Sequence, residues 1–172
     1  MWMKRLGEGG ALTTASGKIA HKKVNEALIN HGWEARDELY YNKWDKLNPG
    51  RRDITTSTVD RDGNKIVIEV KGYGRAGGTA FDKIAYHPDY VRNQRLIGDE
   101  ALHFWCVCVP TESGVYRNND VDQAVRAAEW NLEQQVKSGA IPEGVCRVLH
   151  YTDFLALLAG QEPRKPKQPP LF

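Results

Sequence analysis

The chain has 172 residues, of which 41% are hydrophobic and 27% are charged, so it can bury a domain-sized core without cross-links. Its 24 basic and 22 acidic residues leave a net charge of only +2, which excludes a strong overall field. Binding to nucleic acid would therefore depend on local clusters of basic residues. No segment has the apolar length of a signal peptide or a membrane span, so we expect a cytoplasmic protein with no membrane partner.

The three cysteines indicate neither a disulfide framework nor a zinc site. Cys106 and Cys108 stand in the apolar run 104–109, where we expect buried thiols. An odd number of cysteines without paired spacing is not typical of disulfide-rich domains, and zinc would need a second cluster of Cys or His. The sequence also offers no evident partner for three of its histidines, His31, His103 and His150.

The first half of the chain predicts a helix followed by three strands. Residues 1–14 are rich in glycine and are expected to form a mobile arm. Residues 16–30 carry apolar side chains at helical spacing, and Gly32 is a suitable helix end. Strands are expected next, over residues 33–41, 53–59 and 65–71. The Asp-Gly pair at 62–63 predicts a hairpin between the last two strands.

The second half predicts helices that alternate with strands. A loop with four glycines precedes a helical region, which Pro88 interrupts and which resumes over 89–97. Two more strands and two more helices are expected, namely strands 102–109 and 145–151 and helices 121–136 and 152–159. We expect Asn119 or Asp120 to cap the longer helix and Gly139 to end it. This order predicts an α/β domain over 15–159, with a mixed central sheet flanked by helices, and a flexible tail over 160–172.

The strand near residue 70 has two chemically different faces. Side chains alternate along a strand, so Ile66, Ile68 and Val70 share one apolar face, which we expect to pack on a helix. Glu69 and Lys71 share the other face, where a carboxylate and an ammonium lie two residues apart. An alternative interpretation of this pair is a cross-strand ion pair on a solvated face.

The hairpin would bring Asp53 beside Glu69 and Lys71. Two carboxylates next to a lysine suit phosphodiester hydrolysis, because Mg²⁺ prefers hard oxygen ligands and activates water. The lysine can orient that water or offset charge in the transition state. We expect the backbone carbonyl of Val70 to be a further metal ligand and Mn²⁺ to substitute for Mg²⁺. Asp53 alone could equally close a turn before a strand.

The segments Asp53-Ile54 and Ile68-Glu69-Val70-Lys71 resemble the motif of the PD-(D/E)XK nuclease superfamily. The resemblance covers residues 16–109 and implies a restriction endonuclease-like core of one helix, a three-stranded meander, a helix and a strand. Type II restriction endonucleases and archaeal Holliday-junction resolvases share that core. It also implies that Asp53, Glu69 and Lys71 are catalytic.

Two positions depart from the family pattern. Arg52 stands where the motif's proline is expected. Gly17 and the pair Gly32-Trp33 resemble the first helix of the resolvases, but His21 replaces the glutamate of that helix. His21 is thus a candidate metal ligand or phosphate contact, with a solvated helix residue as the alternative. Glu26 on the same helix is the substitute candidate, with a surface charge as its alternative.

Basic residues and glycines around the motif are candidates for DNA binding, namely Arg51, Arg52, Arg75, Gly77, Gly78, Thr79 and Lys83. Glycine lets the backbone approach a phosphate closely. The stretch 77–80 resembles a segment that leads into DNA in some restriction enzymes. The alternative interpretations are an ordinary helix start at Thr79 and a solvated charged surface.

Residues 168–172 read Gln-Pro-Pro-Leu-Phe and resemble the peptide by which bacterial polymerases and repair proteins bind the sliding clamp. Gln168 would occupy a polar pocket while Leu171 and Phe172 fill an apolar one. The alternative is a tail that packs these two residues on its own domain or on a dimer mate.

The sequence therefore predicts a Mg²⁺-dependent DNA endonuclease that works as a homodimer, because a duplex or junction needs two strand cuts. The first helix and the tail favour branched or repair-associated DNA as the substrate. The glycine-rich loop favours a sequence-specific restriction enzyme. A hypothesis of another class is a DNA-binding module that has kept the fold and lost catalysis.

Overall fold

The computed structural model describes residues 17–33, 35–37, 54–59, 65–73, 79–96, 102–110 and 118–161. The predicted arm over 1–14 and all but the first two residues of the predicted tail over 160–172 lie outside these ranges. None of the helices in the described part of the chain is long and apolar enough to span a membrane.

A helix over residues 17–30 opens the described chain, and Gly32 ends it with a φ of 78°. The strands are β1 (Ala35–Asp37), β2 (Ile54–Val59), β3 (Lys65–Tyr73), β4 (Leu102–Pro110) and β5 (Cys146–His150). The helices that follow in the chain are α2 (Thr79–Ala85), α3 (His87–Leu96), α4 (Asn118–Lys137) and α5 (Tyr151–Leu158). The predicted alternation of helices and strands is confirmed over the described residues.

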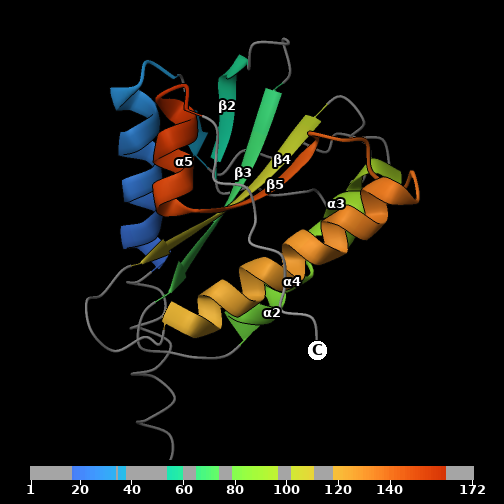
Figure 1. Ribbon diagram of the computed structural model, residues 1–172. Helices are drawn as coiled ribbons and strands as arrows, with labels where there is room; N and C mark the ends of the chain where they lie inside the picture. The colour runs from blue at the N-terminus through green and yellow to red at the C-terminus, as the bar shows by residue number, and fades with distance from the viewer. Residues whose placement is uncertain are drawn as a thin grey trace, which may run out of the picture.

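The five strands form one mixed sheet in the order β1-β2-β3-β4-β5. β2 is antiparallel to both β1 and β3, whereas β3, β4 and β5 run parallel to one another. Parallel neighbours need a crossover connection. Helices α2 and α3 supply it between β3 and β4, and α4 supplies it between β4 and β5. Figure 1 shows these three helices on one side of the sheet, with the 17–30 helix and α5 on the other.

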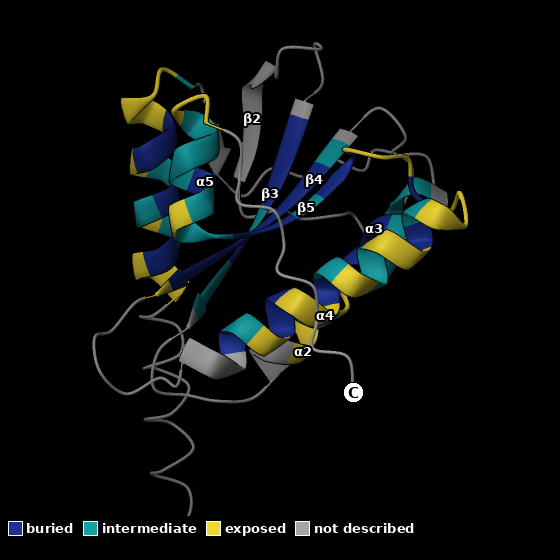
Figure 2. Ribbon diagram, in the orientation of Figure 1, coloured by how far each residue is buried: buried dark blue, intermediate teal, exposed yellow. Residues whose placement is uncertain are grey.

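The 17–30 helix and α5 cover the predicted apolar face of β3. Ile66, Ile68 and Val70 pack in one cluster with Ala20 and Val24 of that helix and with further buried residues of β4, β5 and α5. The strands β3 to β5 are mostly buried along their length (Figure 2). The prediction that this face packs on a helix is confirmed.

The opposite face of the sheet packs against α2, α3 and α4. Cys106 and Cys108 are fully buried there with Ile84 of α2 and residues of α4, and Val67 packs with Val91 of α3. All three cysteines are free and buried, which confirms the sequence prediction for the two on β4.

Three predicted helix boundaries can be compared with the structure. The interruption expected at Pro88 is wrong: α2 and α3 are separated at Tyr86, and Pro88 lies in the first turn of α3, where a missing N–H costs nothing. Gly139, with a φ of 77°, follows α4 as predicted. The expected caps Asn119 and Asp120 are wrong, because α4 already begins at Asn118 and includes both.

The predicted first strand is correct only in part. Trp33 does not belong to it: its N–H bonds to the carbonyl of Leu28, 2.9 Å away, and closes the end of the preceding helix. Its ring packs on Trp105, with centroids 6.3 Å apart. Within the described residues the strand covers Ala35–Asp37.

Candidate active site

Glu69 and Lys71 project from β3 toward the layer formed by α2 and α3. They share a strand face with Val67, which packs on α3. The two side chains are 23% and 18% exposed, so they are largely withdrawn from solvent. Lys71 Nζ donates a hydrogen bond to Glu69 Oε1. The alternating pattern of the sequence thus brings a carboxylate and an ammonium into direct contact.

This pair lines a pocket of about 320 Å³, together with four residues of α2 and α3 and the turn between them, namely Lys83, Tyr86, His87 and Tyr90. Glu69 is the central residue of β3, and Lys71 lies nearer its carboxyl end. The pocket lies between this part of β3 and the layer of α2 and α3.

The helical wall of the pocket is aromatic and basic. His87 is 4% exposed and its ring stacks against Tyr90, with centroids 6.1 Å apart and an interplanar angle of 26°. Tyr86 is 65% exposed. Lys83 is exposed and lines the same pocket as Glu69 and Lys71. In the described part of the chain, Lys83 is thus the predicted DNA-binding residue that lines the same pocket as Glu69.

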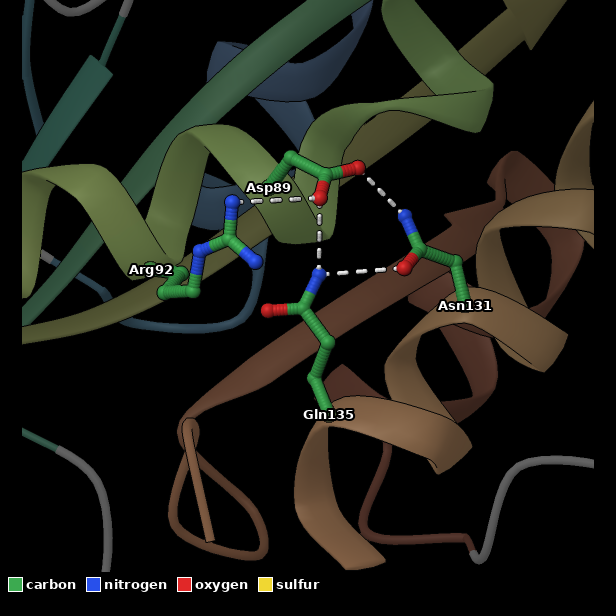
Figure 3. A network of polar contacts seen from close by, with 4 residues as sticks. All are labelled: Asp89, Arg92, Asn131 and Gln135. Atoms are coloured by element: carbon green, nitrogen blue, oxygen red, sulfur yellow. Dashed lines mark hydrogen bonds and ion pairs between the residues drawn. The ribbon is translucent and has the colours of Figure 1, made fainter. Parts of the chain in front are cut away.

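A polar network fixes α3, and with it this wall, to α4 (Figure 3). Asp89 accepts hydrogen bonds from Asn131 Nδ2 at 2.6 Å and from Gln135 Nε2 at 3.0 Å. Gln135 is 6% exposed and also donates to Asn131 Oδ1 at 3.0 Å. Arg92 adds an ion pair to Asp89 at 3.6 Å. Buried and mutually bonded polar groups hold their elements in one arrangement.

Strand pairing sets residues of β4 and β5 beside Lys71. Lys71 is paired with Cys108 on β4, and Cys108 is paired with His150 on β5. His150 Nε2 lies 3.1 Å from Asp122 Oδ1 of α4. The sequence interpretation that His150 has no partner is therefore wrong, and so is that for His31, whose Nδ1 lies 2.7 Å from the carbonyl oxygen of Ala27. Only the packing of α4 on β5 brings Asp122 to His150.

The thiol between these groups is held neutral. A hydrogen bond with Cys106 and burial raise the pKa of Cys108 well above its ordinary value, and the nearby Lys71 ammonium offsets this only in part. The nucleophilic and metal-binding form of cysteine is the thiolate. Cys108 is consequently an unreactive core residue beside Lys71.

The helix candidates lie on another face. His21 and Glu26 belong to the 17–30 helix, which covers the face of β3 opposite to Glu69 and Lys71. His21 is partly exposed and does not line the pocket. Glu26 forms an exposed ion pair with Lys22 at 3.7 Å, as its interpretation as a surface charge predicts.

Several predicted site residues lie outside the described ranges, namely Asp53, Arg51, Arg52, Arg75, Gly77, Gly78, Gln168, Leu171 and Phe172. Thr79 is the first residue of α2, in agreement with the helix-start interpretation. Asp53 immediately precedes Ile54, which is paired with Ile68, the residue before Glu69.

The donor set of the pocket is compatible with magnesium. Among the described residues, no group of three or more His, Cys, Asp or Glu side chains could hold a metal ion, and Glu69 is the carboxylate of the pocket. Mg²⁺ in proteins keeps several waters and uses only one or two carboxylates together with substrate phosphates. Glu69 with one further carboxylate would therefore be sufficient.

The sequence matches no protein-family model and no curated protein. The geometry of the pocket therefore carries the functional conclusion.

Proposed function

We propose that the protein is a Mg²⁺-dependent DNA endonuclease with a restriction endonuclease-like core, in which Asp53, Glu69 and Lys71 form the active site. The observation that carries the proposal is the contact of Glu69 with Lys71 inside a pocket between β3 and the helices α2 and α3. Ile54 is paired with Ile68, and the proposal requires that this antiparallel register continue by one residue, which would set Asp53 opposite Glu69. Residues directly opposite each other in antiparallel strands have their side chains on the same face.

Each residue has a role that its chemistry permits. Glu69, Asp53 and the carbonyl of Val70 would hold Mg²⁺ or Mn²⁺, which when bound polarises the phosphate and lowers the pKa of the attacking water. Lys71 orients that water and offsets the negative charge that develops on the phosphate. Lys83 is exposed at the same pocket and contacts a neighbouring phosphate.

Nicking of supercoiled plasmid in Mg²⁺, with a chelator as the negative control, tests the proposal. We expect Glu69→Gln and Lys71→Met each to lower the nicking rate on the order of 100-fold or more. The matched controls are Glu133→Gln and Lys137→Met, which break an exposed ion pair of 2.6 Å on α4. Nicking by Glu69→Gln at the wild-type rate would place the active site elsewhere.

The same assay separates catalysis from mere binding. A DNA-binding module that has lost catalysis would retain DNA in a gel shift and leave the plasmid intact with every metal. In that outcome the Glu69–Lys71 contact is an ordinary ion pair of a partly solvated strand face.

For the substrate we propose branched or repair-associated DNA, cut by a homodimer, with a sequence-specific restriction enzyme as the alternative. Cleavage of linear duplex, flap, mismatch and four-way junction in parallel decides between them. Recruitment by a sliding clamp through Gln168, Leu171 and Phe172 is a separate proposal. Titration of clamp with the isolated 160–172 peptide tests it, and we expect a micromolar Kd, about −8 kcal/mol. Binding unchanged by Leu171→Ala with Phe172→Ala would leave only packing of the tail.

A further inference from the structure

We infer that the pocket between β3 and the α2–α3 turn takes up one unpaired nucleotide of the DNA, whose base stacks on Tyr86. The inference rests on the proposed function and deepens it, because it names the structural feature of DNA that the site selects. It stands on three properties of the described pocket: an exposed aromatic ring on a hydrogen-bonded backbone, a pair of stacked aromatic rings, and an exposed lysine.

The ring of Tyr86 is exposed while its backbone is fixed. Tyr86 is the one residue between α2 and α3. Its N–H bonds to the carbonyl of Asp82 at 2.9 Å, and its own carbonyl accepts the N–H of Tyr90 at 3.2 Å. Both helices therefore hold the residue, yet 65% of it remains accessible. Single exposed apolar residues are common on protein surfaces, but this one borders the pocket that contains Glu69 and Lys71.

The second property is the stacked pair behind it. His87 and Tyr90 line the same pocket, with nearly parallel rings at 6.1 Å. His87 is 4% exposed, so Tyr90 is the ring of this pair that a base can reach. Tyrosine is one of the side chains on which nucleobases stack when they are free of their own neighbours. In a paired duplex both faces of each base are already covered by adjacent bases, so a paired base cannot use the wall.

The third property is charge. Lys71 compensates Glu69 by direct contact, which leaves Lys83 as the excess positive charge of the pocket lining. A phosphate next to the stacked base would contact it. The volume of about 320 Å³ is at the lower end of ligand pockets, which measure about 300 to 1000 Å³. A pocket of this size suits a ligand on the scale of a single nucleotide.

The test uses the full chain and DNA that carries 2-aminopurine, a fluorescent base quenched by stacking. One substrate has the probe as an unpaired base at a flap junction, and the other has it within a fully paired duplex. Binding is measured in chelator so that no cleavage occurs. We expect quenching of the unpaired probe only. A stacked base contributes about 1–3 kcal/mol, so Tyr86→Ala should weaken flap binding, relative to duplex binding, about 5- to 150-fold.

Two variants make the result specific. Tyr86→Trp retains a stacking surface and should preserve the flap preference. Trp130→Ala removes another exposed aromatic residue, 56% accessible on α4 and outside the pocket, and should leave binding unchanged. Equal loss on both substrates, or no loss with Tyr86→Ala, overturns the inference. Plasmid nicking by the wild type in Mg²⁺ then still supports the proposed function, whereas a Tyr86-dependent flap preference without nicking would refute that function alone.

Discussion

Replacement of Lys71 by methionine should tighten the binding of divalent metal while it abolishes cleavage. Lys71 donates a hydrogen bond to the carboxylate that the metal would need, so a metal ion at Glu69 must first break this ion pair. Exposed ion pairs contribute about 0.2–1 kcal/mol, and loss of one partner of a buried pair costs about 3–5 kcal/mol. The side chains here are 23% and 18% exposed, between these limits. A value of about 2 kcal/mol corresponds to about 30-fold in Kd.

Calorimetric titration with Mn²⁺ measures this change directly. The matched control is Lys83→Met, which removes a cation from the same pocket but from an exposed position. Its effect should be on the order of 3-fold, the scale of a solvent-screened charge. Glu69→Gln should abolish binding at the site. An unchanged Kd for Lys71→Met, or an equal gain in both lysine variants, would refute the view that Lys71 competes with the metal for Glu69.

Two further predictions concern the helices that frame the pocket. Asp89→Ala removes an acceptor from two amide groups of α4, of which only the Gln135 amide retains another, Asn131 Oδ1, and should lower the free energy of unfolding by about 2 kcal/mol. Chemical denaturation measures it, and Arg92→Ala, which removes only a partly exposed ion pair, should cost less than about 1 kcal/mol. Burial, with repulsion from Asp153, raises the pKa of Glu129 from 4.5 to about 6. The folded state therefore disfavours the charged carboxyl, so Glu129→Gln should be stabilising above pH 6, by about 1 kcal/mol after solvent screening of this partly exposed group. The gain should vanish below pH 4.5, where the acid is neutral in both states, and a gain that persists there would contradict the assignment.

Local patterns were sufficient to predict most elements of the sheet and its helices. The two-residue alternation of β3 predicted which side chains face the helix of residues 17–30 and which face α2 and α3. Gly139 marked a helix end because its backbone freedom acts locally, whereas the break expected at Pro88 lies at Tyr86, because a proline fits the first turn of a helix. The predicted contact of Glu69 with Lys71 belongs to the same class of inference, since both residues lie on one strand.

Local sequence patterns could not predict which helical residues line the pocket. Tyr86, His87 and Tyr90 reach the strand pair only because the crossover between parallel strands lays α2 and α3 on that face of the sheet. The pairing of His150 with Asp122 likewise depends on how α4 packs on β5. The sequence placed Tyr86 simply within a helical region, because no periodicity distinguishes an exposed aromatic residue at a pocket from one elsewhere on a surface.

The residues of β4 that are paired with Glu69 and Lys71 affect which metal the site would prefer. Glu69 and Lys71 are paired in register with Cys106 and Cys108 of β4. A thiolate at either position would suit soft or borderline metals. The pKa of Cys108 is raised by its hydrogen bond to Cys106 and by burial, and this outweighs the opposing effect of Lys71. Among the described residues of the pocket lining, Glu69 supplies the carboxylate, and hard oxygen donors are those that Mg²⁺ and Mn²⁺ prefer.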